Sequence, residues 1–427
     1  MINRKETPPI HDAISFEYHL QPVQKEIFQN NVPLWWLNAG TQDVIQLDWV
    51  FHAGLWHEQQ TAVAQSVASL LRNGTTTKSA LEINEAIEYY GASLKVSPNN
   101  DYTIVTLHTL TKHLPALLPV IKEIITEAAF VEEELQTYIR NAQQRLAVNL
   151  RQCDFVANRH IDAFLFGAAH PYGRFTETTD LLALTPQALR DFHQNHYQSQ
   201  NCMMFMAGKI DKSQVTLVND YFGKEAWGGS SLPKVNVYEA HPAAEKKHRI
   251  INDENGVQGA IRIARHFPTR QHPDFTPMLV LNTIFGGYFG SRLMANIREE
   301  KGYTYGIHSQ IYNYRKDGAL LIATEAGKDV CELAVEEIYK EMDLICSERV
   351  DDEELLLVKN YLLGNLLGDL DGPFSIMQRW KNIILNDLPA EQFNNNIEIY
   401  KTVTPAKLQD LAQQYLNKAD YYELVVI

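Results

Sequence analysis

The chain has 427 residues, of which 45% are hydrophobic and 21% charged, and its formal net charge is −14. This composition is ordinary for a globular protein, and the length is sufficient for two or three domains that each bury a core. The acidic balance argues against nucleic acid and against anionic membrane surfaces as partners, because both repel a negatively charged protein.

The cysteines and the N-terminal segment bear on the cellular compartment. Cys153, Cys202, Cys331 and Cys346 show no C-x-x-C spacing, and nothing marks a disulfide framework, so a reducing compartment is favoured. The first residues have no apolar run behind their basic residues, and we expect no signal peptide. No stretch approaches 18 consecutive apolar residues, and we expect no membrane span. We therefore expect a cytoplasmic protein, or a periplasmic one if a leader has been removed.

In chain order, the first half alternates strand-like and helix-like patterns. Apolar residues alternate over Asp43–Phe51, which predicts a half-buried strand, and recur at helical spacing over Thr61–Asn73, where Gly74 follows as a stop. A second strand is expected over Tyr102–Leu107 and a long helix over His113–Ala129. This mixture predicts an α+β fold in which helices pack on one face of an antiparallel sheet.

The segment Lys224–Lys247 mixes Gly, Ser, Pro and charged residues, as an inter-domain linker does. We therefore expect a domain over residues 1–225, a linker over 226–247 and a second domain over 248–427.

The two halves resemble each other. Thr185 and Thr404 each precede a proline and open a helix, and they lie 219 positions apart (404 − 185). Val131 and Val350, each ahead of an acidic helix start, have the same offset. Each Thr-Pro helix leads into an expected strand, over Cys202–Ala207 and Tyr421–Ile427. Two matches at one offset indicate a duplicated domain, although two unrelated α+β domains with similar helix caps remain an alternative.

A distinctive run covers residues 286–305 (GGYFGSRLMANIREEKGYTY). It predicts a Gly-rich turn, a helix with Ser291 as its N-cap, and a helix end at Gly302. A strand should follow, with alternate residues on one face, namely Tyr303, Tyr305, Ile307, Ser309 and Ile311. A tight turn at the glycine would fold this strand back towards the helix end, where Arg298 and Tyr305 could approach each other.

This run resembles the pitrilysin/insulinase metallopeptidases, which include the mitochondrial processing peptidase and bacterial two-chain peptidases. Their second half carries a Gly-rich loop, a Ser-Arg-Leu helix start and an Arg-Glu-Glu-Lys-Gly turn. The first half adds further family features: Asn73-Gly74-Thr75, Tyr90-Gly91-Ala92 and His170-Pro171-Tyr172-Gly173. It ends on Gly208-Lys209-Ile210, where the family usually has Gly-Asp. The resemblance covers nearly the whole chain and implies two homologous α+β domains.

The resemblance also implies catalytic roles for Arg298 and Tyr305. In the family an Arg and a Tyr seven positions apart hydrogen-bond the substrate carbonyl and its tetrahedral intermediate, and these two residues match that spacing (305 − 298 = 7). A fixed cation and a phenol donor stabilise an oxyanion that exists only in the transition state. The alternative is that Arg298 caps a helix end and Tyr305 fills a core.

The zinc site of the family is missing. Its H-x-x-E-H motif places two His ligands and a Glu base on one helix, shortly before Asn73-Gly74-Thr75. Gln65 and Ser69 stand at the ligand positions and Ala68 at that of the base, and no H-x-x-E-H occurs anywhere in the chain. The third ligand should fall within 143–146, which reads Gln-Gln-Arg-Leu. We therefore expect no metal and no cofactor in this chain.

One histidine pair is a weaker candidate for a metal site. His193-x-x-His196 has a metal-ligand spacing, but it lies on a helix that the family uses for packing. His52 and His57 flank a turn and are expected at the surface or at the rim of a site.

The first functional hypothesis is the non-metal subunit of a heterodimeric zinc endopeptidase that cuts short, largely unfolded peptides. Such a subunit is inactive alone, and its expected partners are a zinc-carrying homologous subunit and a peptide, while a homodimer stays open. In such enzymes the substrate adds as a strand to a sheet edge within a closed chamber. The resemblance makes Ala92–Val96 a candidate edge, with Leu94, Lys95 and Val96 as substrate-binding residues, and an ordinary paired strand is the alternative.

Two other hypotheses stay open. The chain could be a non-catalytic peptide-binding or scaffold protein, like the family's core subunits in a respiratory complex. It could also be a self-sufficient hydrolase with a relocated site, although no Ser-His-Asp or Cys-His spacing stands out.

Overall fold

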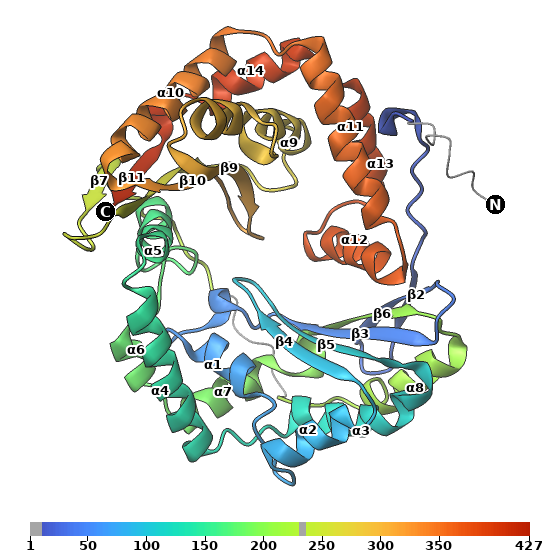
Figure 1. Cartoon of the computed structure of the whole chain (residues 1–427). Helices are drawn as coiled ribbons and strands as arrows, with labels where there is room; N and C mark the ends of the chain where they lie inside the picture. The colour runs from blue at the N-terminus through green and yellow to red at the C-terminus, as the bar shows by residue number, and fades with distance from the viewer. Residues whose placement is uncertain (1–10, 230–235) are drawn as a thin grey trace, which may run out of the picture. The chain divides into compact units, whose positions relative to one another are not determined.

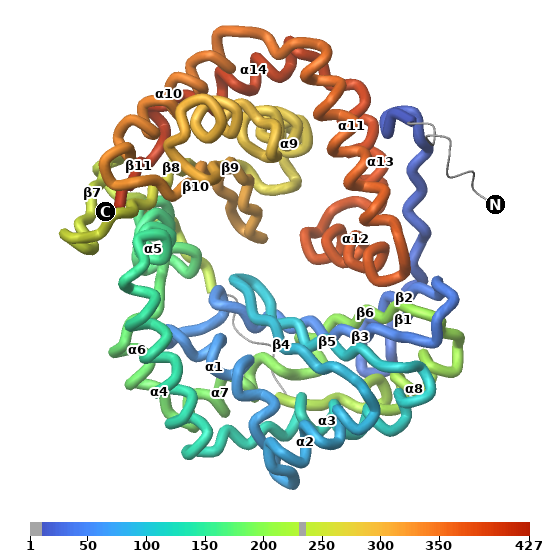
Figure 2. Tube along the Cα trace, viewed as in Figure 1, coloured from blue at the N-terminus to red at the C-terminus, as the bar shows by residue number. Residues whose placement is uncertain are grey.

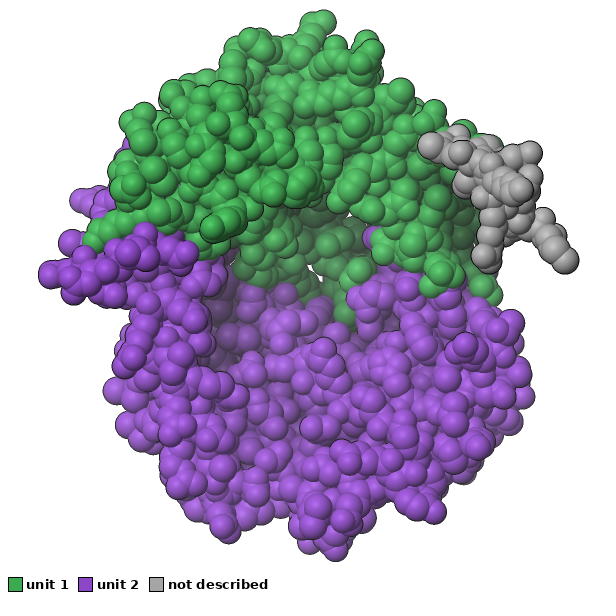
Figure 3. Space-filling model, viewed as in Figure 1, with its two compact units in different colours: residues 1–21, 265–371, 382–421 green, residues 22–264, 372–381, 422–427 purple. Residues whose placement is uncertain are grey.

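The computed structural model describes residues 11–229 and 236–427. The chain forms two compact units (Figure 3). Unit 1 comprises Met1–Gln21, Arg265–Asp371 and Asn382–Tyr421, and unit 2 comprises Pro22–Ala264, Gly372–Lys381 and Tyr422–Ile427. Residues 230–235 of the expected linker lie outside the described residues, and the sequence-based boundaries at 225 and 248 stay a prediction.

A six-stranded sheet in the order β1-β2-β6-β3-β5-β4 forms the centre of unit 2. Its pairs are antiparallel except β2 and β6, which run parallel. The strands are β1 (Gln24–Ile27), β2 (Pro33–Asn38), β3 (Val44–Phe51), β4 (Ser93–Pro98), β5 (Thr103–Leu110) and β6 (Cys202–Gly208). The strands expected over Asp43–Phe51, Tyr102–Leu107 and Cys202–Ala207 are therefore confirmed.

Helices α1, α2, α3, α7 and α8 lie on one side of this sheet (Figures 1 and 2). Alternate residues of β3 are fully buried in the core beneath it, which explains the apolar alternation of that segment: Ile45, Leu47, Trp49 and Phe51. The helices of unit 2 are α1 (Val63–Leu70), α2 (Ala80–Glu88), α3 (Leu114–Thr126), α4 (Glu132–Asn149), α5 (Cys153–Phe166), α6 (Thr178–Leu182), α7 (Pro186–His196) and α8 (Lys212–Phe222).

The opposite face of the sheet is also contacted by a helix. Residues 373–381 of α12 (Pro373–Leu385) belong to unit 2. Lys381 Nζ lies 2.7 Å from Asp48 Oδ2 on β3, and both side chains are buried. The ring of Phe374 packs against His108 on β5 at a centroid distance of 5.7 Å. The sequence indicated helices on one face only, and it gave no sign of this contact.

The second sheet repeats the topology of the first. Its order is β7-β11-β8-β10-β9, which matches β2-β6-β3-β5-β4, and β7 pairs parallel with β11 as β2 does with β6. Its strands are β7 (Lys247–Ile250), β8 (Gln258–His266), β9 (Thr304–Asn313), β10 (Gly318–Gly327) and β11 (Tyr422–Val426). Each half thus ends on a strand inserted between two earlier ones.

The helices show the same duplication. Helices α7 and α14 (Pro405–Tyr415) both have 11 residues, and Thr185 and Thr404 accept a hydrogen bond from the N–H three positions later, as capping requires. Helices α4 and α11 (Asp352–Asp369) both have 18 residues. The expected fold of two homologous α+β domains is confirmed.

Unit 1 also contains α9 (Phe275–Asn282), α10 (Cys331–Ser347) and α13 (Gln392–Thr402), and two π-helical segments, η5 (Thr283–Gly287) and η6 (Met294–Glu300). The short 3-10 turns of the chain are η1 (Ala13–Ser15), η2 (Leu55–His57), η3 (Thr111–His113), η4 (Ser199–Asn201), η7 (Lys328–Val330) and η8 (Lys418–Asp420).

The first described residues of the chain belong to unit 1, where they run alongside α11 (Figure 1). The backbone N–H of Ile14 donates to Asn360 Oδ1 at 3.0 Å, and Tyr18 donates to the carbonyl of Leu363 at 3.1 Å. The four cysteines carry free thiols. Of the helices in the described ranges, none is long and apolar enough to cross a membrane.

Candidate functional site

Arg298 lies on the π-helical segment η6 of unit 1. The N–H of Lys301 donates to the carbonyl of Asn296, five residues earlier, and that of Tyr303 donates to Ile297, at 2.9 and 3.0 Å. Such wide turns are rare and are frequently found at functional sites. Ser291 does not cap this segment as predicted, because its Oγ is buried without a hydrogen bond to any described residue.

Polar contacts fix the start of this helical segment. Arg292 makes two parallel hydrogen bonds to Glu354 on α11, at 3.0 and 2.7 Å. Asn296 donates to Glu341 on α10 at 2.8 Å, and burial raises the pKa of that carboxyl. Bidentate pairs of this kind restrict geometry as well as adding stability, so the helix that carries Arg298 is held on two sides.

The Arg298 side chain leaves most of its donors uncommitted. Its Cζ lies 4.5 Å from the ring centroid of Phe289, which is itself 65% exposed. One guanidinium nitrogen lies 3.6 Å from a Glu299 carboxylate oxygen, and the Arg298 side chain is 33% exposed. The ring orients the cation from one side, and the guanidinium edge can still bind an external acceptor.

Tyr305 is presented by a β-bulge at the start of β9. Thr304 pairs with Ala326 and Ile307 with Thr324, so that β9 has one more residue than β10 between the two pairs. The extra residue reverses the alternation of the strand. Tyr305 is therefore 97% exposed while Ile307 is 2% exposed. The prediction that both side chains share one face is wrong.

Two threonines satisfy the backbone of this bulge. Thr304 Oγ1 donates to the carbonyl of Glu325 at 2.6 Å and accepts from the N–H of Gly306 at 3.1 Å. Thr324 Oγ1 donates to the carbonyl of Gly306 at 2.8 Å. The phenol hydroxyl of Tyr305 has no hydrogen-bond partner within the described part of the chain and is available to a ligand. The alternative that Tyr305 fills a core is excluded by its exposure.

Gly302 makes the turn that connects the two candidate residues. Its φ of +66° lies in the left-handed region, which suits glycine. The turn brings the N–H of Tyr303 to the carbonyl of Ile297, next to Arg298. Among the described residues, no hydrogen bond or ring contact joins Arg298 to Tyr305, so they form two separate groups of donors.

Helix α1 of unit 2 carries the positions where the family has its zinc motif. Gln65 and Ser69 are exposed, and their side chains contact each other with Nε2 3.4 Å from Oγ, whereas Ala68 is buried. Over residues 11–229 and 236–427, no group of three His, Cys, Asp or Glu side chains could hold a metal ion. The residues present on α1 do not fit a zinc ion.

A pocket of about 190 Å³ adjoins α1. It brings Gln65 together with the α4 positions expected to hold the third ligand, and Arg145 and Leu146 line it. Two residues of the range 143–146, where the third ligand was expected, thus lie in one pocket with Gln65. We refer to this pocket below as the Arg145 pocket.

The N-terminus of α1 is capped by a buried carboxyl group that the sequence did not reveal. Glu58 accepts hydrogen bonds from the N–H groups of Ala62 and Ala64, at 3.3 and 2.9 Å, and from Arg174 at 3.0 Å. Burial raises the pKa of Glu58 to about 7 in spite of these donors. A carboxylate at this position interacts favourably with the positive end of the helix dipole.

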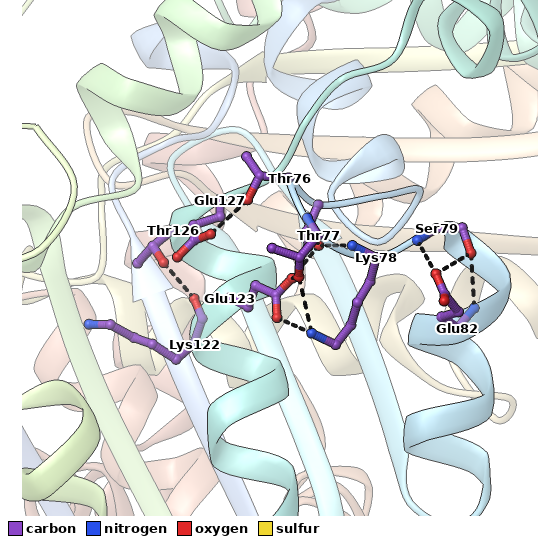
Figure 4. A network of polar contacts seen from close by, with 10 residues as sticks. Thr76, Thr77, Lys78, Ser79, Glu82, Lys122, Glu123, Thr126 and Glu127 are labelled. Atoms are coloured by element: carbon purple, nitrogen blue, oxygen red, sulfur yellow. Dashed lines mark hydrogen bonds and ion pairs between the residues drawn. The ribbon is translucent and has the colours of Figure 1, made fainter.

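The loop after α1 is fixed to α3 by a polar network (Figure 4). Thr75, Thr77 and Lys78 all contact the carboxylate of Glu123, and these contacts lower its pKa although burial opposes them. Thr76 donates to Glu127 at 2.7 Å. Helix α1 is therefore held at both ends, which preserves its position although the metal ligands are absent.

The histidine pair on α7 is structural. His193 Nε2 donates to the carbonyl of Ile125 at 2.8 Å, and His196 Nδ1 donates to that of His52 at 3.0 Å. Burial lowers the pKa of both imidazoles to about 4. His52 and His57 are half-buried, and their rings pack at a centroid distance of 5.8 Å.

Strand β4, which contains the predicted substrate-binding residues, lies at the edge of its sheet next to β5. Lys95 is exposed and Val96 half-buried, but the Leu94 side chain is buried in the core and its carbonyl accepts from Arg72 at 2.7 Å. Leu94 therefore packs inside the unit, and Lys95 is the one exposed residue of the three predicted substrate-binding residues.

Comparison with known proteins agrees with this architecture. Residues 38–170 match the family described as Insulinase (Peptidase family M16), and residues 183–362 match the Peptidase M16 inactive domain. The chain is 23% identical to an uncharacterised zinc protease of Mycobacterium leprae over 83% of this chain and 80% of that protein. It is also 23% identical to one of Bacillus subtilis, over 84% and 87%.

Solved structures show the same fold. A structure described as the peptidase M16 inactive domain of Pseudomonas fluorescens aligns with a TM-score of 0.85 at 19% identity, covering 95% of this chain and 98% of that one. A protease of Helicobacter pylori aligns with a TM-score of 0.86 at 13% identity, over 95% and 99%. With its duplicated topology and both halves matched, the chain belongs to the insulinase-type peptidases of family M16.

Proposed function

We propose that this chain is the non-metal subunit of a heterodimeric zinc endopeptidase. It supplies Arg298 and Tyr305 to stabilise the oxyanion of a peptide substrate, while a zinc-carrying homologous subunit supplies the metal and the general base. The observation that carries the proposal is that Arg298 and Tyr305 keep free donors on well-supported backbone, whereas Gln65, Ala68 and Ser69 occupy the metal-site positions.

Activation of water and stabilisation of the oxyanion can be carried out by two different chains. Attack of a metal-activated water on a peptide carbonyl produces a tetrahedral oxyanion, and a guanidinium and a phenol are both strong donors to it. These donors act only on the charge that develops during the reaction, so they need not belong to the subunit that activates water. Alone, the chain has no group on α1 to activate water and is inactive.

The test is reconstitution with a homologue that carries H-x-x-E-H. Hydrolysis of an internally quenched peptide should require both chains. Arg298→Ala and Tyr305→Phe in this chain should each lower kcat of the mixture by about 10²–10³, because each removes one oxyanion donor. Arg140→Ala, on the exposed surface of α4, is the matched control and should leave kcat unchanged.

Two results would refute the proposal. One is a zinc-carrying homologue whose activity does not change when this chain is added. The other is full turnover with Arg298→Ala, which would favour the scaffold alternative, because a scaffold needs no oxyanion donors.

A further inference from the structure

The Arg145 pocket combines an apolar floor with a polar rim. Its floor is lined by side chains of α4, α5 and α6, namely Ala142, Leu146, Phe155 and Leu181. Gln65, Arg145 and Asn149 contribute the polar groups. The volume of about 190 Å³ corresponds to roughly six water molecules at their share of the liquid, ~30 Å³ each, which is space for one amino-acid side chain.

Arg145 is the one charged residue among those that line this pocket. None of its lining residues is acidic. Within the described ranges, Arg145 makes no ion pair and no side-chain hydrogen bond, so its planar set of N–H donors is free. An arginine keeps its charge at any physiological pH, and the pocket therefore presents a permanent cation.

A second guanidinium lies behind the pocket wall. Arg159 packs over the ring of Phe155 with Cζ 5.4 Å from its centroid, and it donates to the carbonyl of Thr176 at 3.1 Å. Its Nη1 is buried without a hydrogen-bond partner among the described residues. Glu177 interacts with Arg159 electrostatically and offsets part of this charge. Both Phe155 and Thr176 line the pocket, so the second cation adds to the positive potential there.

We propose that the Arg145 pocket binds a carboxylate carried on an apolar stem. The stem would occupy the floor, and the carboxylate would accept two parallel hydrogen bonds from Arg145, the geometry in which guanidinium and carboxylate match best. Gln65 stands at one metal-ligand position and Arg145 lies in the range expected for the third ligand, so a guanidinium and an amide in this place favour an anion over a cation. Two sources share this chemistry, namely the C-terminal residue of a peptide and an acidic side chain within one.

The inference rests on the proposed function in one respect, since it takes the ligand to be a peptide. The test uses binding to the full chain alone and needs no partner subunit. Fluorescein-labelled pentapeptides ending in Ala-Leu, with a free carboxylate or a carboxamide, are titrated at low ionic strength and followed by anisotropy. A third peptide is amidated and carries Glu in place of the last residue.

The free acid should bind about tenfold or more tightly than the amide, because a charge-assisted hydrogen-bonded pair is lost in the amide. Arg145→Gln should remove this preference, whereas Arg140→Gln on the same helix should keep it, since Arg140 contacts Thr137 and does not line the pocket. The Glu peptide identifies the source: affinity equal to that of the free acid shows that a side-chain carboxylate suffices, and affinity equal to that of the amide assigns the site to a C-terminus.

Equal affinity for acid and amide, absence of binding, or a preference that survives Arg145→Gln would each overturn the assignment. Thermal unfolding of Arg145→Gln at the wild-type temperature excludes a folding defect as the cause of lost binding. These outcomes are separate from the turnover of Arg298→Ala in the reconstituted pair, so either proposal can fail while the other stands.

Discussion

A single extra residue determines how Tyr305 is displayed. In a regular strand Tyr305 would share a face with Ile307 and Ser309, both of which are buried. The bulge at the start of β9 turns the phenol outwards instead. A strand pattern of period two contains no signal for such an insertion, because Thr304 and Thr324, whose hydroxyls stabilise it, lie on different strands.

Thr324→Val tests the bulge. The substitution keeps the shape of the buried side chain but removes the hydroxyl that donates to Gly306. We expect a loss of about 1–2 kcal/mol in the free energy of unfolding, measured by urea denaturation. In the reconstituted pair we also expect a lower kcat with little change in KM. Thr324→Ser restores the donor and should restore both quantities, and an unaffected kcat in the valine variant would show that the hydroxyl does not position Tyr305.

At the scale of elements, η5 and β9 approach so closely that a side chain does not fit between them. A Cβ on Gly286 would lie 2.7 Å from Ser309 Cβ and 2.8 Å from Ser309 N. Asn282 and Ser309 hydrogen-bond to each other across the same contact, at 2.6 Å between side-chain oxygens. The close packing of η5 against β9, the strand that carries Tyr305, therefore explains the glycine at position 286 of the Gly-rich run.

Gly286→Ala should consequently destabilise unit 1 by about 1–3 kcal/mol through overpacking. Gly364→Ala is the matched control, because a Cβ there meets only Ala13 Cβ at 3.9 Å and the residue lies inside α11. That variant should gain up to about 1 kcal/mol from helix propensity. Urea unfolding of both variants measures the contrast, and equal effects would contradict the packing argument.

The contact of α12 with the first sheet includes one buried ion pair. Asp48 accepts hydrogen bonds from Gln46 at 2.8 Å, from Thr106 at 2.6 Å and from Lys381 at 2.7 Å. Lys381→Met should lower the free energy of unfolding by about 3–5 kcal/mol, because it leaves a buried carboxylate without its counter-charge.

Adding Asp48→Asn to Lys381→Met removes the unpaired charge and should recover part of that loss. The two single variants and the double variant form a thermodynamic cycle in urea unfolding. If the effects of the two substitutions simply add, the pair contributes no coupling and the argument fails.

Sequence periodicity was sufficient to locate the helices and strands that bury only one of their faces. The segments that became β3, β5, α3 and α7 were located to within a few residues, since burial on a single side leaves a regular pattern. The π-helical turns and the contact of Lys381 with Asp48 were not foreseeable. They depend on partners far apart in the chain, and no local pattern records them. The same holds for the Glu58 cap, whose partner Arg174 lies 116 positions away.

For the whole molecule, the duplicated halves have diverged in different places. The first half keeps α1 and its supports but has Gln65, Ala68 and Ser69 at the metal positions, while the second half keeps Arg298 and Tyr305. The resemblance to a family located these residues from sequence. It did not show that Gln65 and Arg145 share a pocket, because that depends on how α1 and α4 pack.

Stability of the whole molecule should depend on pH through its buried imidazoles. The pKa values of His193 and His196 are lowered from 6.5 to about 4. Between these two pH values the unfolded chain binds protons that the folded chain does not. The contribution of the two histidines to the free energy of unfolding is therefore complete above pH 6.5 and is lost as pH falls towards 4. Burial raises the pKa of Glu58 and Asp162 to about 7, so their contribution is present at low pH and lost as pH rises through 7, which opposes the histidines.

His193→Gln isolates one of these contributions. The amide can still donate to the Ile125 carbonyl but does not titrate. The decrease in the free energy of unfolding from pH 7 to pH 5 should be smaller in this variant than in wild type by about 2 kcal/mol, measured by urea unfolding at both pH values. His19→Gln, at an exposed position, is the control. Identical pH dependence in wild type and His193→Gln would mean that His193 has the same pKa in the folded and the unfolded chain.

The two compact units are interleaved along the polypeptide. The segment of Ile14 and Tyr18 belongs with α11, while β11 at the other terminus belongs with the unit of the opposite half. Dividing the gene between its two halves would therefore leave the opening segment on one fragment and α11, which it contacts, on the other, whereas β11 would stay with β7 and β8. The C-terminal fragment would lack the segment that packs on α11, so the two halves of the duplicated fold do not pack independently of each other.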